Sequence, residues 1–371
     1  MLKRKRRHPA ILVLACISLI ISLILWSKIR SQGAFNPPAE SSANIDLDCS
    51  LLHKIPGPTS FTITGTQELV IASQDRQAGI YDQSWPQGAI YLANPTDQSK
   101  PPINISKEFK DEFHPRSLAL FEDQHGRTLF VVNYRTGGFS VEIFDFKDQK
   151  LIHKKTLTSS HFVQPGAIAA RDHQSFYLIN EHGLFTSTGH FIEDFFNLKK
   201  SHLLYFDGME FTKLIDGFKL AYGLSYEAGE RLIYLSDMKG KKVYVYQHNV
   251  HSVSADFVYS TDTDFHPAGL FIDQQSGALW MTGYPQLLQA NSHMMNPKEI
   301  PAPSQVIAYS SLKNKNPEFT EVMQSLSSGL SSATQVVPYS KNLILGGAFE
   351  NHLVTCKTKS DASLSFSKLS R

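Results

Sequence analysis

The sequence predicts an all-β protein, a six-bladed β-propeller preceded by an N-terminal transmembrane signal-anchor helix. Three observations carry this prediction: one uncharged apolar segment near the N-terminus, six similar apolar runs along the rest of the chain, and a cysteine on each side of those runs. Together they divide the 371 residues into a basic cytoplasmic tail (1–9), an anchor (10–26), a linker (27–43), a propeller (44–358) and a polar tail (359–371).

The N-terminal segment has the layout of a membrane anchor. Residues 3–7 are all basic, residues 10–26 carry no charge, and Lys28 and Arg30 follow. An apolar segment of this length lies at the short end of a membrane span and just above a signal-peptide core. A cleaved signal is the alternative, with a weak cleavage site near residues 31–34. The positive-inside rule places the N-terminus in the cytoplasm and the propeller outside it, in a periplasmic, luminal or extracellular compartment.

The near-neutral net charge of the chain argues against a nucleic-acid partner. The chain has 36 basic and 34 acidic residues, a formal net charge of +2. General nucleic-acid binders usually carry a clear basic excess, so we expect no nucleic-acid partner. Hydrophobic residues make up 42% of the chain and charged residues 19%, which excludes a disordered chain and permits a large folded core.

Six five-residue apolar runs, each ending in a small or polar residue, predict the blades. They cover residues 69–73, 129–133, 176–180, 232–236, 279–283 and 343–347, and their starts lie 47 to 64 residues apart. Shorter apolar strands precede some runs, as at 117–120 and 269–272. Alternating strands follow others, as at 141–146 and 242–246. A period near 50 with three or four strands per unit is typical of a propeller, with an irregular sandwich as the alternative.

The cysteines suggest how the ring closes. Cys49 precedes the first unit, Cys356 follows the last, and Cys16 lies inside the anchor. A propeller must join its first and last blades, because an open ring leaves sheet edges bare. A Cys49–Cys356 disulfide would hold that seam and would require an oxidising compartment. The alternative is two unrelated buried thiols.

Several segments resemble the paraoxonase/arylesterase family. They are residues 114–117, 131–134, 141–144, 216–218 and 242–246, together with the terminal cysteine pair. The similarity covers about residues 44–358 and keeps the order of the blades. It implies a six-bladed propeller with calcium in the central tunnel, hydrolysis of esters and lactones, and in some members an N-terminal anchor. The broader relatives are strictosidine-synthase-like and gluconolactonase-like propellers.

The family's functional positions fall on unexpected residue types here. Its two proton-relay histidines fall on Arg116 and Tyr134, and a further pocket histidine falls on Tyr284. Calcium takes six to eight oxygen ligands, several of them anionic, so the resemblance implies a calcium cofactor that these positions do not favour. The positions of its calcium ligands fall on Thr59, Ser60, Gly166, Ala167, Tyr222, Ala268 and Gly269.

Three units begin in a similar way and suggest a different pocket. His114, Gln164 and His266 each precede a proline at the start of an inner strand. Equivalent positions of a propeller converge on its axis, so these side chains are expected near one mouth of the tunnel. The alternative is that both histidines are turn residues facing solvent. A two-histidine metal site is a further possibility but lacks a carboxylate as third ligand.

Two functions follow from these observations. The first is a membrane-anchored ester or lactone hydrolase with an altered site, for which the candidate catalytic residues are His114, Arg116, Tyr134 and His266. The second is a non-catalytic propeller that binds a small anionic or aromatic ligand, or a partner protein, at the tunnel mouth. Its pocket would include Gln164, Tyr222 and Tyr284, and Arg116 would make a bidentate contact with a carboxylate.

Overall fold

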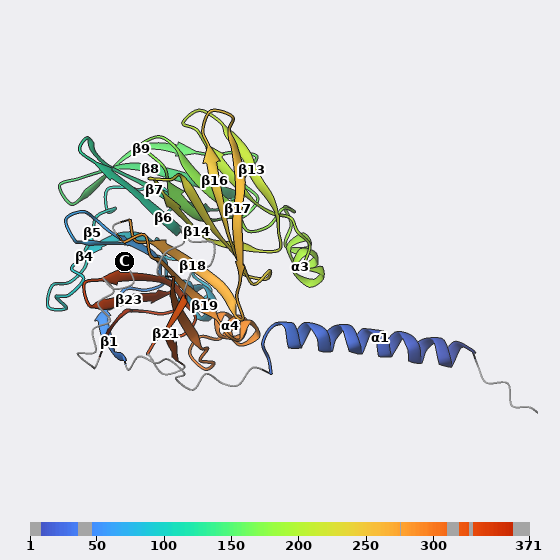
Figure 1. Cartoon of the computed structure of the whole chain (residues 1–371). Coiled ribbons are helices and arrows are strands. Elements are labelled where there is room, and N and C mark those ends of the chain that lie inside the picture. The colour runs from blue at the N-terminus through green and yellow to red at the C-terminus, as the bar shows by residue number, and fades with distance from the viewer. Residues whose placement is uncertain (1–8, 36–46, 275, 310–318, 326–328, 359–371) are drawn as a thin grey trace, which may run out of the picture.

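The computed structural model describes residues 9–35, 47–274, 276–309, 319–325 and 329–358. Residues 1–8 of the predicted basic tail, residues 36–43 of the predicted linker and the predicted polar tail at 359–371 lie outside these residues. The described strands form six four-stranded antiparallel sheets arranged as the blades of a propeller (Figure 1). The predicted fold class is therefore confirmed.

Each blade is a meander in which the innermost strand comes first in the chain. Blade 1 contains β2 (Pro58–Ile63), β3 (Leu69–Ser73), β4 (Ala89–Ala93) and β5 (Ile103–Asn104). Blade 2 contains β6 (Pro115–Asp123), β7 (Gly126–Arg135), β8 (Gly138–Lys147) and β9 (Lys150–Leu157). Blade 3 contains β10 (Pro165–Ala170), β11 (Phe176–Asn180), β12 (Ser201–Phe206) and β13 (Phe211–Phe218). Blade 4 contains β14 (Ala221–Glu227), β15 (Leu232–Asp237), β16 (Lys242–Asn249) and β17 (Ser254–Asp262). Blade 5 contains β18 (His266–Ile272), β19 (Leu279–Tyr284), β20 (Ser304–Tyr309) and β21 (Phe319–Ser325).

Blade 6 closes the ring with strands from both ends of the chain. It contains β22 (Ala333–Tyr339), β23 (Asn342–Gly347) and β24 (Leu353–Thr358), and β1 (Leu47–His53) completes it. Cys49 and Cys356 face each other across the β1–β24 pair and form a disulfide. The predicted seam bond is confirmed, and it removes the bare sheet edges that an open ring would leave.

The six predicted runs are the second strands of the six blades, and burial on both faces explains their composition. Every described residue of β3 and β11 is buried. On β3, Leu69 belongs to the apolar cluster between blades 6 and 1, whereas Val70 belongs to the cluster between blades 1 and 2. A strand that is covered on both faces favours a continuous apolar run over alternation.

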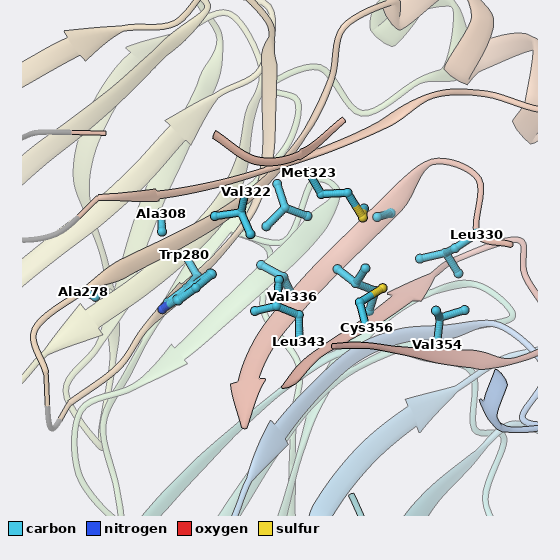
Figure 2. Close-up of a cluster of buried hydrophobic side chains, with 13 residues drawn as sticks. Ala278, Trp280, Ala308, Val322, Met323, Leu330, Val336, Leu343, Val354 and Cys356 are labelled. Carbon is cyan, nitrogen blue, oxygen red and sulfur yellow. The ribbon is translucent and has the colours of Figure 1, made fainter. Parts of the chain in front are cut away.

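An apolar cluster fills each of the six interfaces between neighbouring blades. Figure 2 shows the one between blades 5 and 6, where Trp280 and Val322 face Val336 and Leu343. Cys356 belongs to the same cluster, so the disulfide adjoins the apolar interior. Burying a large apolar side chain contributes roughly 1.5–3 kcal/mol, which makes these interfaces the main source of stability.

Three short helices lie at one end of the propeller. The helices α2 (Arg76–Tyr81), α3 (Ser187–Phe196) and α4 (Leu287–Met295) connect the second and third strands of blades 1, 3 and 5. The inner strands begin at this end, which is called the helix face below. They end at the opposite end, where tight turns lead into the second strands; this is the hairpin face.

The N-terminal helix α1 (Pro9–Ser31) leaves from the helix face (Figure 1). The backbone amide of Leu288 on α4 donates to the carbonyl of Gln32, and Lys28 Nζ lies 5.7 Å from the ring centroid of Phe195 on α3. The helix continues five residues past the predicted end of the anchor, because residues 27–31 contain no glycine or proline. Gly33 follows with a φ of 75°, which an αL residue after a helix commonly adopts. Residues 11–31 are long and apolar enough to cross a membrane, a test that a signal sequence also passes.

Candidate ligand-binding site

The inner strands of all six blades enclose a central cavity of about 910 Å³. Near the helix face its wall is formed by residues at the start of the inner strands, namely Thr59, Arg116, Gly166, Tyr222, Gly269 and Thr334. Six of the seven residues at which the resemblance places the family's calcium ligands line this cavity, and Ala268 is not among its lining residues. From there the cavity runs along the inner strands to their turns at the hairpin face, including Gly65 and Ser340.

An ion pair lies at the helix-face end of the cavity. Arg116 Nη2 on β6 donates to Glu181 Oε1 at 2.7 Å, with 18% of the Arg116 side chain and 8% of the Glu181 side chain exposed. Burial lowers the pKa of Arg116, but the Glu181 carboxylate and the neighbouring Tyr222 and Tyr134 together raise it well above its ordinary value. Arg116 is therefore a permanent cation at the end of the cavity.

Small residues make room for this pair. A Cβ added to Gly166 would lie 2.4 Å from Glu181 Oε1, so a side chain at this position would displace the carboxylate. Glu181 follows β11 directly, and its backbone amide donates to the carbonyl of Gln164. The glycine at position 166 on β10 therefore leaves the space that the Glu181 carboxylate occupies next to it.

A second guanidinium lies near the first. Arg76 is the first residue of α2, whose N-cap Asp75 accepts a hydrogen bond from the amide of Ala78. Arg76 donates to the Thr59 hydroxyl and, at 3.3 Å, to the carbonyl of Ala348. Burial, and next the nearby Arg116, lower the pKa of Arg76 to about 10. Glu181 is paired with Arg116, and Arg76 donates to two neutral oxygens, so the two guanidiniums carry one more charge than this carboxylate.

Three tyrosines surround the arginines. The Tyr134 hydroxyl donates to the carbonyl of Pro165 at 2.9 Å, and the Tyr222 ring centroid lies 5.7 Å from Arg116 Cζ. Tyr284 is fully buried and packs with Leu287 of α4. Burial, and next the Glu181 charge, raise the pKa of Tyr134; burial, and next Tyr222, raise the pKa of Tyr284. Tyr134 and Tyr284 therefore stay neutral at physiological pH. Of the three tyrosines, Tyr222 lines the described cavity.

Neighbouring blades are joined at this level by side-chain hydroxyls. Ser117 donates to the carbonyl of Gly166, Ser236 to that of Ala268 at 2.8 Å, and Thr334 to that of Thr59 at 2.9 Å. The strands approach closely, since a Cβ on Gly269 would lie 2.0 Å from the Thr334 carbonyl oxygen. Carbonyls at three of the family's calcium positions thus already accept a hydrogen bond.

The structure separates the predicted pocket residues into two groups. Arg116 and Tyr222 line the cavity, whereas Tyr134 and Tyr284 are not among its lining residues. His114, Gln164 and His266 do not belong to the described wall of the cavity. His114 contacts Gln74 and Glu112 instead, with its Nδ1 3.0 Å from Gln74 Oε1. Position along the chain places these three residues at one level of the ring but does not set the direction of their side chains.

His266 is buried below the helix face. Its Nδ1 donates to the carbonyl of Met238 at 3.0 Å, and 3% of the residue is exposed. Burial, and next the nearby Lys241, lower its pKa from 6.5 to about 4. The imidazole is therefore neutral at physiological pH. Its pKa lies well below the neutral range that suits an efficient general base.

This histidine should make the protein acid-sensitive. The unfolded chain takes up the proton near pH 6.5 and the folded chain only near pH 4, so acidification across this window favours unfolding. We expect the free energy of unfolding to fall by up to about 1.4 kcal/mol per pH unit from this group alone. Urea unfolding at pH 7, 5.5 and 4.5 should show a shallower loss in His266→Gln than in wild type. The exposed His125→Gln is the control, and equal slopes in the two variants would contradict the prediction.

Sequence reasoning missed Arg76, Glu181 and Thr334. Arg76 and Glu181 lie just beyond the second strands of blades 1 and 3, in connections whose side chains follow no strand period. One signal was present: both are charged residues placed within three positions of a fully buried strand end. Such a position falls close to the tunnel axis at the helix face.

The fold and site define a disulfide-closed six-bladed propeller with a ligand-sized central cavity that ends in a buried arginine–glutamate pair. The family profile described as arylesterase matches residues 47–357, and the chain belongs to this family. No three His, Cys, Asp or Glu side chains within the described ranges are grouped closely enough to hold a metal ion.

Curated relatives agree with this family assignment, and a solved structure shares the fold. The chain is 25% identical to the Gallus gallus protein "Serum paraoxonase/arylesterase 2" over 279 residues, 72% of this chain and 76% of the relative. It is 23% identical to "Serum paraoxonase/arylesterase 1" of Homo sapiens over 254 residues, 68% of this chain and 70% of the relative. A solved luciferin-regenerating enzyme superposes with a TM-score of 0.54 at 11% identity, covering 85% of this chain and 96% of the other, a likeness of fold alone.

Proposed function

We propose that this member of the arylesterase family binds a small organic carboxylate in its central cavity, with Arg116 as the anchor, and does not use calcium-assisted hydrolysis. The observation that carries the proposal is the half-buried guanidinium of Arg116, which pairs with Glu181 and has the half-buried guanidinium of Arg76 near it at the helix-face end of the cavity. A net positive, partly desolvated site favours an anionic ligand.

The donor set does not fit calcium. This ion takes six to eight oxygens, several of them anionic. The side chains at the family's calcium positions are hydroxyls, hydrogens, methyls and one phenol, and the Thr59 hydroxyl already accepts from Arg76. The one nearby carboxylate is paired with Arg116, and two guanidiniums would repel a divalent cation. These features support ligand binding over metal-assisted chemistry.

We propose further that α1 anchors the propeller in a membrane with the N-terminus in the cytoplasm. The basic residues 3–7 before the helix outnumber Lys28 and Arg30 at its end, which favours this orientation. The disulfide supports the same topology, because such bonds persist in oxidising compartments outside the cytoplasm.

Butanoate binding to the full chain in phospholipid nanodiscs tests the proposal. Calorimetry should detect binding that persists in the presence of a chelator. Arg116→Gln, checked for folding by circular dichroism, should weaken it at least tenfold, because a charge-assisted hydrogen bond contributes about 1.5–3 kcal/mol. The matched control is Arg231→Gln, since Arg231 is exposed and lies outside the described cavity wall.

Ester or lactone hydrolysis is the second candidate, and family membership favours it. The same nanodisc preparation is assayed on phenyl acetate and on a γ-lactone, with calcium and with a chelator. We expect no turnover under either condition. Turnover that the chelator abolishes would contradict the binding proposal. Chelator-resistant turnover that is lost in Arg116→Gln would make Arg116 part of a metal-independent site.

A further inference from the structure

The helix α3 on the helix face turns its apolar side away from the propeller. Phe191 and Phe196 on α3, and Phe185 just before it, are 66%, 64% and 69% exposed. The side of α3 that faces the propeller instead carries Gly189 and Glu193, which are both buried. A surface helix usually packs its apolar stripe against the core. In α3 this arrangement is reversed.

Polar contacts hold α3 in this orientation. The Glu193 carboxylate accepts hydrogen bonds from the backbone amides of Gly183 and Leu184, the shortest at 2.6 Å. Asp194 forms an ion pair with Lys239, which lies between β15 and β16. Because these contacts tie the helix to blades 3 and 4, the fold itself fixes the outward direction of the aromatic side chains.

The outward aromatic side chains form one continuous group. The rings of Phe191 and Phe195, one helical turn apart, are stacked with their centroids 5.9 Å apart. Phe195 also meets the ring of Phe196 edge-on, with the centroids 5.0 Å apart. Ile192 on the same helix is 39% exposed. A contiguous apolar group on the surface of a folded domain typically marks a contact site.

The N-terminal helix indicates what this aromatic group would contact. Lys28 on α1 lies 5.7 Å from the ring centroid of Phe195, and α3 lies beside the point where α1 leaves the helix face (Figure 1). Lys28 follows the uncharged residues 10–26 by two positions, about 3 Å along a helix. If α1 spans a membrane, a lysine at this position lies at the level of the lipid headgroups. Phe195 then lies at that level as well.

Several basic side chains lie on the same face as the aromatic group. Lys199 and Lys200 follow α3 within four residues and are exposed. Arg30 on α1 is exposed as well, and Lys219 lies near Lys28. Helices that lie in a membrane interface commonly combine aromatic side chains with lysine and arginine, which attract anionic lipids. This combination favours a lipid surface over an apolar protein partner.

We propose that the aromatic side chains of α3 insert into the interface of the membrane that α1 spans and form a second contact between the propeller and the bilayer. The inference rests on the membrane anchor proposed above and goes beyond it, because α1 alone attaches the propeller at one point. Interfacial helices bury their apolar side about 5–10 Å deep. With α3 at this depth, the helix face is held against the membrane.

Fluorescence quenching by lipid tests the contact. In a Cys16→Ser background of the full chain, Phe191→Cys is labelled with the environment-sensitive dye NBD. The protein is placed at one copy per nanodisc in a phosphatidylcholine–phosphatidylglycerol bilayer. Nitroxide groups on the acyl chains should quench the dye at least twofold. The control is Ile152→Cys, an exposed apolar position on β9, which should keep its emission. Absence of quenching at position 191 would overturn the inference.

A second pair of variants separates insertion from closeness to the anchor. Phe185→Ser/Phe196→Ser should lose most of the quenching at position 191. Phe257→Ser, which removes an exposed phenylalanine on β17, should keep it. Circular dichroism checks that each variant is folded. Unchanged quenching in the double variant would show that α1 brings the dye near lipid without insertion of α3, and the inference would be wrong.

The anchor is tested separately with a dye on the native Cys16 of α1, which the same nitroxide lipids should quench. Quenching at position 16 without quenching at position 191 would overturn the inference and leave the anchor intact. No quenching at either position would overturn both. Self-quenching of the dye at position 191 when two chains share a disc, with no quenching by lipid, would show that a second copy covers α3 and would also overturn the inference.

Discussion

Replacing Glu181 with glutamine will destabilise the propeller by about 3–5 kcal/mol, the cost of leaving a buried charge without its partner. The substitution removes the carboxylate that pairs with Arg116, while the charge of the nearby Arg76 remains. Arg116→Met should destabilise the propeller less than Glu181→Gln does. In this variant Glu181 still has a cation nearby, because Arg76 lies close enough for the carboxylate to raise the pKa of Arg76. The double variant Arg116→Met/Glu181→Met should recover much of the loss, since a buried pair can be replaced by apolar groups at little cost.

Urea unfolding of the full chain measures this ranking. The exposed pair Lys154–Asp145, 2.9 Å apart with side chains 55% and 48% exposed, is the control. Removing either of its members should change stability by no more than about 1 kcal/mol. A larger loss in Arg116→Met than in Glu181→Gln would show that the second guanidinium does not act on the site.

Loss of the Cys49–Cys356 disulfide should be the other large effect. The bond joins residues 307 positions apart, and the chain-entropy description gives about 5 kcal/mol as an upper limit for such a loop. Reduction, or the double variant Cys49→Ala/Cys356→Ala, should lower the urea midpoint and release β1 from β24. Hydrogen exchange should show that loss of protection first at residues 47–53.

The control for the disulfide is Cys16→Ser, which lies on α1 and should leave the urea midpoint unchanged. A non-reducing peptide map of the protein isolated from its membrane should contain the Cys49–Cys356 linkage. Its absence there would contradict the proposed placement of the propeller outside the cytoplasm. Equal stability of the oxidised and reduced forms would show that the β1–β24 hydrogen bonds close the ring without it.

The blades could be predicted because their strongest signal is local. A second strand is covered by neighbours on both faces, so runs such as residues 69–73 and 176–180 are apolar throughout. The inner strands are less regular, since part of each faces the cavity. The ring closure followed from topology, because the two cysteines outside the repeats had to meet if the sheet edges were to be covered.

The site could be predicted only in part. Arg116 and Tyr222 were assigned to the site by the family resemblance, and both lie at the start of inner strands on the cavity wall. Glu181 lies beyond a strand end, where only three-dimensional packing against Gly166 fixes its direction. His266 was expected at the tunnel and instead bonds to the backbone of Met238, because its ring turns outward from the axis into the helix face.

The composition of blade 6 has a consequence for biosynthesis. Its outermost strand, β1, is made before every other strand, whereas its partner β24 is the last to be made. Blades 1 to 5 each have all their strands consecutive in the chain and can pair as they emerge. The ring itself cannot close until residues 353–358 have been translated, so β1 waits with an open edge throughout synthesis. The disulfide therefore forms only after Cys356 has been translated, and a polypeptide truncated before Cys356 cannot form it.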